Sequence, residues 1–254
     1  MKLMSFALRV VSDLRSVFLL VRFVIALILA VVIYSFGLLF LPKAFWWRVI
    51  ISKIGWLCLW SGGQKLTVHG SAPPVENGPY LFILNHQSFF DGFVVARSFP
   101  YRVTGLGAKS YFKLPLWGWM MKLHGIIPVD RRNHESALVS IKKTEEAFQR
   151  GESLAIFPEG TRTPDGQLQD FKAGAFHLAV SAKATIVPVA IIGAAEAWPK
   201  GSWRIKPGRL AVAFGQPISC DNCRKLYAGE NAVSNLKNLT RLRIAGLLSQ
   251  KGDK

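Results

Sequence analysis

Short apolar runs alternate with longer amphipathic stretches over the part of the chain beyond residue 63. The amphipathic stretches predict helices, among them residues 88–98, 134–150 and 172–182. The short runs predict buried strands at residues 66–69, 80–84, 103–106, 125–129, 154–157, 185–192 and 210–214. This alternation is typical of an α/β fold with a mostly parallel sheet flanked by helices. We therefore predict one α/β domain over residues 63–254.

The first 62 residues have a different pattern. No charged residue occurs between Phe23 and Leu41, and a helix of this length approaches the ~30 Å hydrocarbon core of a bilayer. A second apolar stretch at residues 44–60 contains four tryptophans, the residue type that prefers the membrane interface. We predict that residues 1–62 form a two-helix hairpin embedded in the cytoplasmic leaflet. The alternative is a signal peptide, but no small-residue cleavage site follows the apolar run.

The chain is strongly basic, with a formal net charge of +17 and a pI near 10.2. Such a balance often indicates nucleic-acid binding. Here the basic residues are spread along the chain, no nucleic-acid-binding signature occurs, and 50% of the residues are hydrophobic. We therefore predict no nucleic-acid partner and favour an anionic membrane surface, which attracts each nearby basic residue by roughly 1 kcal/mol.

The three cysteines give no disulfide framework. Cys220 and Cys223 form a lone C-x-x-C, which is compatible with a redox motif or with half of a zinc site. A zinc site needs two more ligands at a suitable spacing, and none follows. We expect no metal site.

One candidate base comes directly after the strand predicted at residues 80–84. His86 lies in the connection to the next helix, and Asp91 lies near the first turn of that helix. If Asp91 accepts the Nδ1 proton, Nε2 is a free acceptor that can take a proton from an alcohol. The alternative is a capping box, with Ser88 at the N-cap and His86 as a polar turn residue.

A second motif follows the strand predicted at residues 154–157. Its sequence is Phe157-Pro158-Glu159-Gly160-Thr161-Arg162. An arginine fork, a hydroxyl and a flexible backbone are the groups that hold a phosphate. The alternative is an ordinary Pro-Gly turn with an arginine on the surface.

Four ordered blocks of the sequence resemble the glycerolipid acyltransferases, and among them the bacterial lysophosphatidic acid acyltransferases (1-acylglycerol-3-phosphate O-acyltransferases). The first two are Asn85-His86 with Asp91, and Gly125-Ile126-Ile127-Pro128-Val129-Asp130-Arg131. The other two are the motif at residues 157–162, and Ile186-Val187-Pro188-Val189-Ala190-Ile191. The resemblance covers residues 68–218. Within it, this sequence differs from many relatives in having Pro128 and a second arginine, Arg132, after Arg131.

The resemblance implies a role for each matching residue. His86 would deprotonate the glycerol hydroxyl, and Asp91 would orient it. The fourth block would help to form the acyl-donor side of the cleft. The glycerol phosphate would be bound by Arg131, Glu159, Gly160, Thr161, Arg162 and, ahead of the second block, Lys109, for which a solvated charge is the alternative. A helix pair at the N-terminus is also known in this family.

Two classes of function remain open. One is a membrane-bound enzyme that moves an acyl group from a thioester of acyl-carrier protein or coenzyme A to lysophosphatidic acid, or to another lyso-lipid such as a lyso-ornithine lipid. The other is a non-catalytic lipid-binding protein of the same fold. The intact His86/Asp91 pair favours the enzyme, because a scaffold needs neither residue. We expect no cofactor, and we expect the catalytic domain on the cytoplasmic side of the inner membrane.

Overall fold

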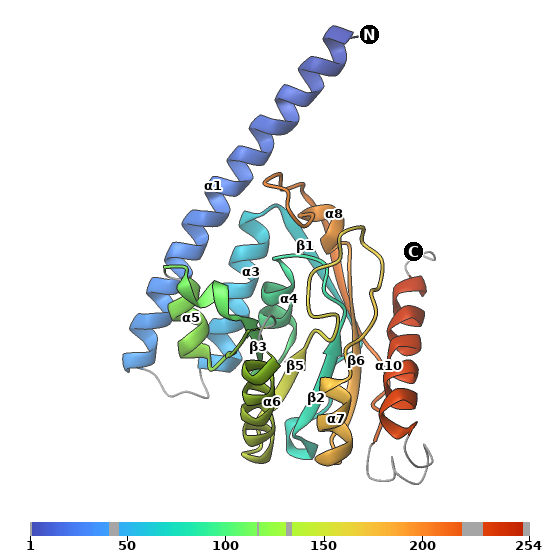
Figure 1. The fold of residues 1–254 in the computed structure, drawn as a ribbon. Coiled ribbons are helices and arrows are strands. Elements are labelled where there is room, and N and C mark those ends of the chain that lie inside the picture. The colour runs from blue at the N-terminus through green and yellow to red at the C-terminus, as the bar shows by residue number, and fades with distance from the viewer. Residues whose placement is uncertain (1, 41–45, 116, 131–133, 220–230, 251–254) are drawn as a thin grey trace.

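The computed structural model contains one seven-stranded sheet with helices on both faces (Figure 1). It describes residues 2–40, 46–115, 117–130, 134–219 and 231–250. The strand order is β1-β7-β6-β2-β5-β3-β4, and every neighbouring pair is parallel except β6 and β7. This sheet confirms the predicted α/β class. The strands are β1 (Gln64–His69), β2 (Tyr80–Leu84), β3 (Val103–Ala108), β4 (Ile127–Val129), β5 (Ser153–Ile156), β6 (Thr185–Ile192) and β7 (Gly208–Phe214).

Two hydrophobic cores lie on opposite faces of the sheet. Alternation along β2 explains the division, because Tyr80, Phe82 and Leu84 face one core while Leu81 and Ile83 face the other. All five side chains are buried, which accounts for the continuous apolar run in the sequence.

Each core has its own helices. The first is covered by α1 (Lys2–Phe40), α3 (Ser52–Ser61), α4 (Asp91–Ser98) and the short α8 (Ala194–Ala197). The second is covered by α6 (His134–Gln149), α7 (Gly174–Ser181) and α10 (Ala232–Ser249). Helix α5 (Trp117–His124) and two 3-10 turns (Val75–Asn77 and Lys109–Lys113) complete the described elements beyond residue 63.

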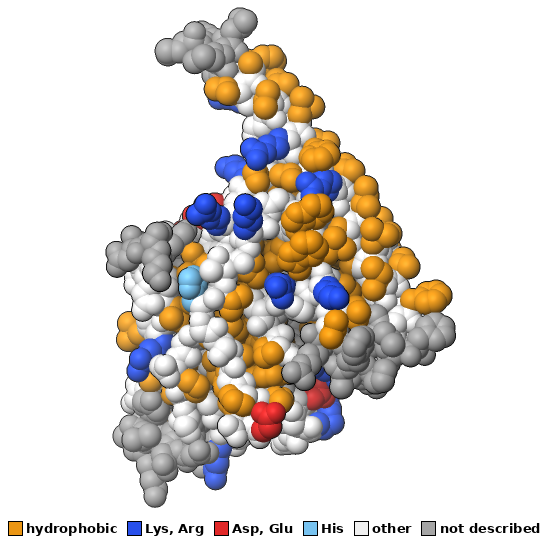
Figure 2. Space-filling view, turned by 180° about the vertical axis from the view of Figure 1, so that it is seen from behind, with side chains coloured by type: hydrophobic (Ala, Val, Ile, Leu, Met, Phe, Trp, Pro, Cys, Tyr) orange, Lys and Arg blue, Asp and Glu red, His pale blue; other side chains and the backbone are white. Residues whose placement is uncertain are grey.

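Helix α1 is longer than the uncharged stretch that predicted it. It begins at Lys2, and its N-terminal half projects beyond the sheet domain (Figure 1). Residues 6–37 are long and apolar enough to cross a membrane, judged by length and composition alone. Hydrophobic side chains line the outer surface of the projecting helix, with Lys and Arg side chains among them (Figure 2).

The other face of α1 packs on the protein. Leu19, Phe23, Ala30 and Tyr34 are buried in the first core. Phe23 is 2% exposed, and its ring meets four aromatic rings edge-on at centroid distances of 5.4 to 6.3 Å. These rings belong to Phe89, Phe90, Phe93 and Trp198. The second N-terminal segment consists of a π-helical turn (Trp46–Ile51) and α3, from which Ile54, Cys58 and Leu59 join the same core.

Candidate active site

One oxygen of the Asp91 carboxylate binds three groups of the turn at residues 86–88. This oxygen, Oδ2, lies 2.7 Å from His86 Nδ1, and it accepts the backbone N–H groups of Gln87 at 2.6 Å and Ser88 at 2.9 Å. Asp91 is fully buried, whereas the His86 side chain is 21% exposed. Because a carboxylate only accepts hydrogen bonds, Nδ1 is the donor of this pair, and in the neutral imidazole Nε2 then carries the lone pair. The structure therefore has the geometry that a general base requires.

The same carboxylate also performs part of the alternative role in capping. Helix α4 begins at Asp91, three residues later than the sequence predicts. Asp91 accepts the Ser88 N–H, as the acidic residue of a capping box does, and Ser88 Oγ accepts the Phe90 N–H at 3.3 Å. The two interpretations of this motif are thus compatible, since one oxygen serves the turn and the imidazole together.

The second motif and Thr163, the residue that follows it, hold the backbone of His86 from both sides. His86 N–H donates to Glu159 Oε1 at 2.6 Å, and the His86 carbonyl accepts the Thr163 N–H at 2.8 Å. Glu159 Oε2 accepts the Gln169 N–H at 3.1 Å. Burial raises the pKa of Glu159, while the hydrogen bonds from the His86 and Gln169 backbone N–H groups lower it. The Glu159 side chain therefore bonds to backbone groups of the protein, and its bond to the His86 N–H positions His86.

Two further residues support His86, and sequence reasoning assigned a role to neither. The Phe157 ring stacks on the imidazole with a centroid distance of 4.3 Å and an interplanar angle of 25°. Asn85 exchanges two hydrogen bonds with the backbone of Ile191, at 2.7 and 2.8 Å, and so joins the end of β2 to β6. Both residues belong to the sequence motifs, and their position beside His86 and Glu159 is the local signal that could have indicated a role.

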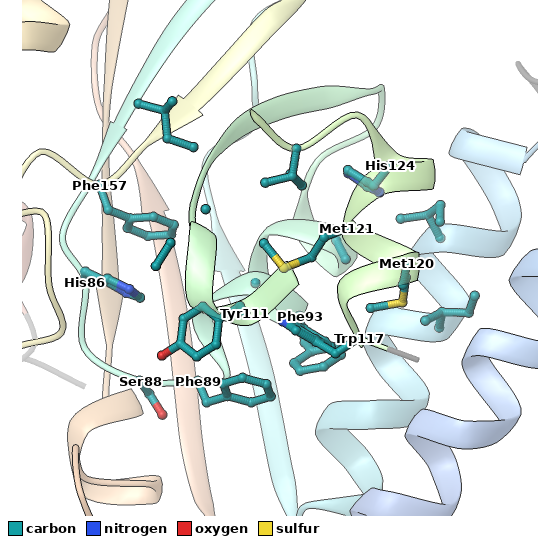
Figure 3. A pocket seen from close by; sticks show the side chains of 18 of the residues that line it. His86, Ser88, Phe89, Phe93, Tyr111, Trp117, Met120, Met121, His124 and Phe157 are labelled. Carbon is teal, nitrogen blue, oxygen red and sulfur yellow. The ribbon is translucent and has the colours of Figure 1, made fainter. Parts of the chain in front are cut away.

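An apolar cavity of ≈ 220 Å³ opens beside the imidazole (Figure 3). His86 and Phe157 stand at one side of it, and Trp117, Met120 and His124 of α5 stand at the opposite side. Tyr34 of α1 and Ile54 of α3 also line the cavity, so the N-terminal helices form part of its wall. Burial lowers the pKa of His124 to about 4, which keeps this second histidine neutral. The cavity can hold an apolar chain whose reactive end lies at His86.

The predicted phosphate-binding residues lie in different places. Arg162 lines the cavity together with His86. Thr161 is exposed, and its hydroxyl accepts a hydrogen bond from Lys200 Nζ at 3.0 Å. Gly160 has a φ of +73° and lines a second cavity, which His86 and Arg162 do not line. Lys109 is exposed in the Lys109–Lys113 turn, next to Ala108 of the cavity wall.

Other predicted features fall outside the cavity or outside the described residues. Arg131, Arg132 and the C-x-x-C motif lie outside the described residues. The fourth block lies inside β6, where it forms core contacts and bonds to Asn85; none of its residues is among the described residues that line the cavity. In the part of the chain that the structure describes, no cluster of three potential metal ligands occurs.

The geometry of Asp91 determines the expected effect of Asp91→Asn. Three donors converge on Oδ2, so the asparagine oxygen should occupy that position and preserve the histidine tautomer. Its NH₂ group then takes the place of Oδ1, which is buried and has no hydrogen-bond partner among the described residues. The substitution removes mainly the charge that stabilises the imidazolium. We expect a loss in kcat of roughly 10- to 10²-fold, with Asp91→Ala worse.

These features define a class of protein: an α/β sheet domain that holds a histidine–carboxylate pair at the mouth of an apolar cavity. The family model described as Acyltransferase matches residues 65–192, a span that includes His86, Asp91 and the whole second motif. The chain belongs to this acyltransferase family.

Similar proteins agree with this assignment. A 1-acyl-sn-glycerol-3-phosphate acyltransferase from Pseudomonas aeruginosa is 31% identical over 182 residues, which cover 71% of this chain and 68% of that protein. The protein of the same name from Limnanthes alba is 35% identical over 170 residues, and the match covers 66% of this chain. The chain spans 60% of the length of this plant relative.

A solved structure shares the fold. The 1-acyl-sn-glycerophosphate (LPA) acyltransferase PlsC from Thermotoga maritima superposes with a TM-score of 0.77 at 22% sequence identity. The superposition covers 93% of this chain and 97% of that chain. The shared architecture therefore extends over nearly the whole of both chains.

Proposed function

We propose that this protein is a membrane-bound acyltransferase that acylates the free glycerol hydroxyl of lysophosphatidic acid and so produces phosphatidic acid. The observation that carries the proposal is the His86/Asp91 pair, whose free Nε2 faces an apolar cavity that Arg162 also lines. A base, an apolar site and a cation are three of the groups that this reaction uses. The names of the similar proteins support the choice of acceptor.

The proposed reaction is direct acyl transfer. His86 Nε2 takes the proton of the acceptor hydroxyl as its oxygen attacks the thioester carbonyl carbon. The C–S bond of the tetrahedral intermediate then breaks, and the leaving thiol receives the proton from the imidazolium. Asp91 stabilises the charge that forms on His86 between these steps. Cys58, the one cysteine among the described residues, is buried in α3 and takes no part.

The cavity suits the acyl chain of the donor. Its walls are mostly aliphatic, aromatic and methionine side chains, and its polar end is the one that contains His86 and Arg162. A chain that enters from this end would leave its thioester carbonyl beside Nε2. The donor is a thioester of acyl-carrier protein or of coenzyme A, with the carrier outside the cavity.

The N-terminal helices support the proposed membrane attachment. The exposed apolar face of α1 and the exposed side chains of Trp56 and Trp60 suit the hydrocarbon and interface of a bilayer. Arg22 lies 4.4 Å from the Trp60 ring centroid and adds a cation at that level. We place the catalytic domain on the cytoplasmic side of the inner membrane, where acyl thioesters are made.

Arg162→Ala tests the proposed site for phosphate. An arginine fork binds a phosphate with two hydrogen bonds, so its loss should raise the apparent KM for lysophosphatidic acid by roughly tenfold or more. The KM for the acyl donor should change much less. Arg162→Lys should recover little, because lysine cannot make the bidentate contact. Equal changes in both KM values would instead indicate a structural role.

Gly92→Leu tests the occupant of the cavity. Gly92 is in the first turn of α4 and lines the cavity, and a Cβ atom placed there meets nothing within 4 Å. A leucine should therefore fill the cavity while α4 stays intact, and the enzyme should prefer shorter acyl chains. Product lengths from a mixture of acyl donors, measured by mass spectrometry, give the result. Gly246→Leu, in open space on α10, is the matched control and should leave the preference unchanged.

A single assay tests the proposed function itself. Purified protein in detergent micelles is offered lysophosphatidic acid, a lyso-ornithine lipid and a neutral monoacylglycerol, each with acyl-carrier protein or coenzyme A thioesters. We expect the highest kcat/KM with lysophosphatidic acid. A preference for another lyso-lipid would reassign the acceptor. No transfer to any acceptor would favour the non-catalytic alternative.

A further inference from the structure

Lys200 approaches the second motif from a distant part of the chain. It follows α8, and its Nζ atom donates to the Thr161 hydroxyl at 3.0 Å. Thr161 directly precedes Arg162, so Lys200 contacts the residue next to Arg162. No sequence motif contains Lys200, and the family match ends at residue 192.

The loop that carries Lys200, residues 198–206, is fixed at its beginning. The Trp198 carbonyl accepts the Ser88 hydroxyl at 2.9 Å, which ties this loop to the His86 turn. The Trp198 ring packs against Phe89 and Phe90, and its indole N–H donates to the Ser202 carbonyl at 2.8 Å. Lys200 therefore lies on a loop whose first residue, Trp198, is held by contacts with the protein.

The end of the loop is fixed as well, by helix α1. Arg204 forms a two-atom ion pair with Asp13, at 2.5 and 3.1 Å, and Ser16 Oγ donates to the Ile205 carbonyl at 3.1 Å. The Lys206 N–H donates to the Ala197 carbonyl at 2.8 Å. A cation on such a loop loses little conformational freedom when it binds an anion.

The charges of Lys200 and Arg162 are uncompensated. Among the described residues, neither forms an ion pair with a carboxylate, whereas Arg204 of the same loop is paired with Asp13. The acidic residue of the turn, Glu159, is 5% exposed, and its oxygens accept backbone N–H groups of the protein. Arg162 on this turn and Lys200, which reaches the turn from the 198–206 loop, are two unpaired cations that can bind an anion with more than one negative charge.

We propose that Lys200 binds the phosphate monoester of the acceptor together with Arg162, with its ammonium already held in place by Thr161. This inference rests on the proposed function and deepens it, because it adds a binding residue from outside the motifs. The phosphate groups of the donor carrier are the competing source of the anion. A monoester of the acceptor is favoured because the loop is bonded to Ser88, which also lines the cavity at His86.

The test compares Lys200→Gln with Lys206→Gln. Lys206 is exposed in the same loop, so its substitution removes an equal charge away from the turn. We expect Lys200→Gln to raise the KM for lysophosphatidic acid about threefold to tenfold, the range for a partly exposed charge-assisted contact. The KM for the donor and the kcat/KM for monoacylglycerol should stay unchanged. Lys200→Arg should restore the KM, and Lys206→Gln should behave as the wild type.

The outcomes separate this inference from the proposed function. A rise in the donor KM alone would assign Lys200 to the carrier phosphate and overturn the proposal. Equal losses with lysophosphatidic acid and monoacylglycerol, or equal effects of Lys200→Gln and Lys206→Gln, would also overturn it. Calorimetric titration of each variant with lysophosphatidic acid in micelles gives a readout that needs no turnover. Wild-type affinity in Lys200→Gln would exclude the contact even if the protein catalyses another reaction.

Discussion

Replacing His86 with alanine is expected to lower kcat by at least ~10²-fold, and by as much as ~10⁴-fold, the range for a lost general base. The protein should stay folded, because alanine keeps the backbone N–H and carbonyl that bond to Glu159 and Thr163. The measurement is initial-rate turnover of lysophosphatidic acid with saturating acyl donor. Thermal unfolding of the same sample shows whether the variant is intact.

A matched control is available for this substitution. His177 is an exposed histidine on α7, away from the cavity, and His177→Ala should leave turnover unchanged. Near-normal turnover in His86→Ala would exclude the proposed mechanism. A fall in turnover that is accompanied by unfolding would instead show that the contacts of the His86 side chain with Asp91 and Phe157 are a structural requirement.

The second large effect is expected at Phe23, where alanine should reduce the free energy of unfolding by about 3–5 kcal/mol, as for other large-to-small changes at buried aromatic residues. Phe23 lies on the helix that the sequence predicts as a membrane anchor. It is nevertheless 2% exposed and packs on the rings around the His86 turn. The loss should therefore appear as a lower melting temperature of the whole catalytic domain in detergent.

Phe6→Ala is the control for this experiment. Phe6 is on the same helix but is 69% exposed, so the same truncation there removes no packing within the protein. It should weaken binding to lipid vesicles while the melting temperature stays near that of the wild type. If Phe23→Ala also left the melting temperature unchanged, α1 would be an anchor only, and its contacts with the first core would contribute little.

The difference between these two phenylalanines shows what the sequence can predict. An uncharged helix has the same pattern whether a residue faces lipid or protein, so the burial of Phe23 could not be inferred. The strands were easier, because apolar runs such as residues 80–84 and 185–192 are bounded by polar or turn residues. Both coincide with observed strands, β2 and β6.

Prediction of the site from the sequence was limited in a similar way, because local contacts could be predicted and contacts between distant residues could not. The spacing of His86 and Asp91 within one turn was enough to predict their contact, which is present at 2.7 Å. Thr161 and Arg162 were singled out by their residue types. The contact of Lys200 with Thr161 joins residues 39 positions apart, and that of Ser88 with Trp198 joins residues 110 positions apart. Only the course of the sheet and its loops brings such partners together.

The two hydrogen bonds that hold the His86 backbone have a consequence for variation in this site. Glu159 and Thr163 hold the main chain of the proposed base. A substitution near either residue can therefore shift His86 and change the effect of a substitution in the His86 turn. Effects of changes in the two motifs should not add, since residues that share partners are energetically coupled. Sequence changes here are therefore expected to be epistatic, and an exchange of acceptor specificity between relatives would require both loops to be transplanted as a pair.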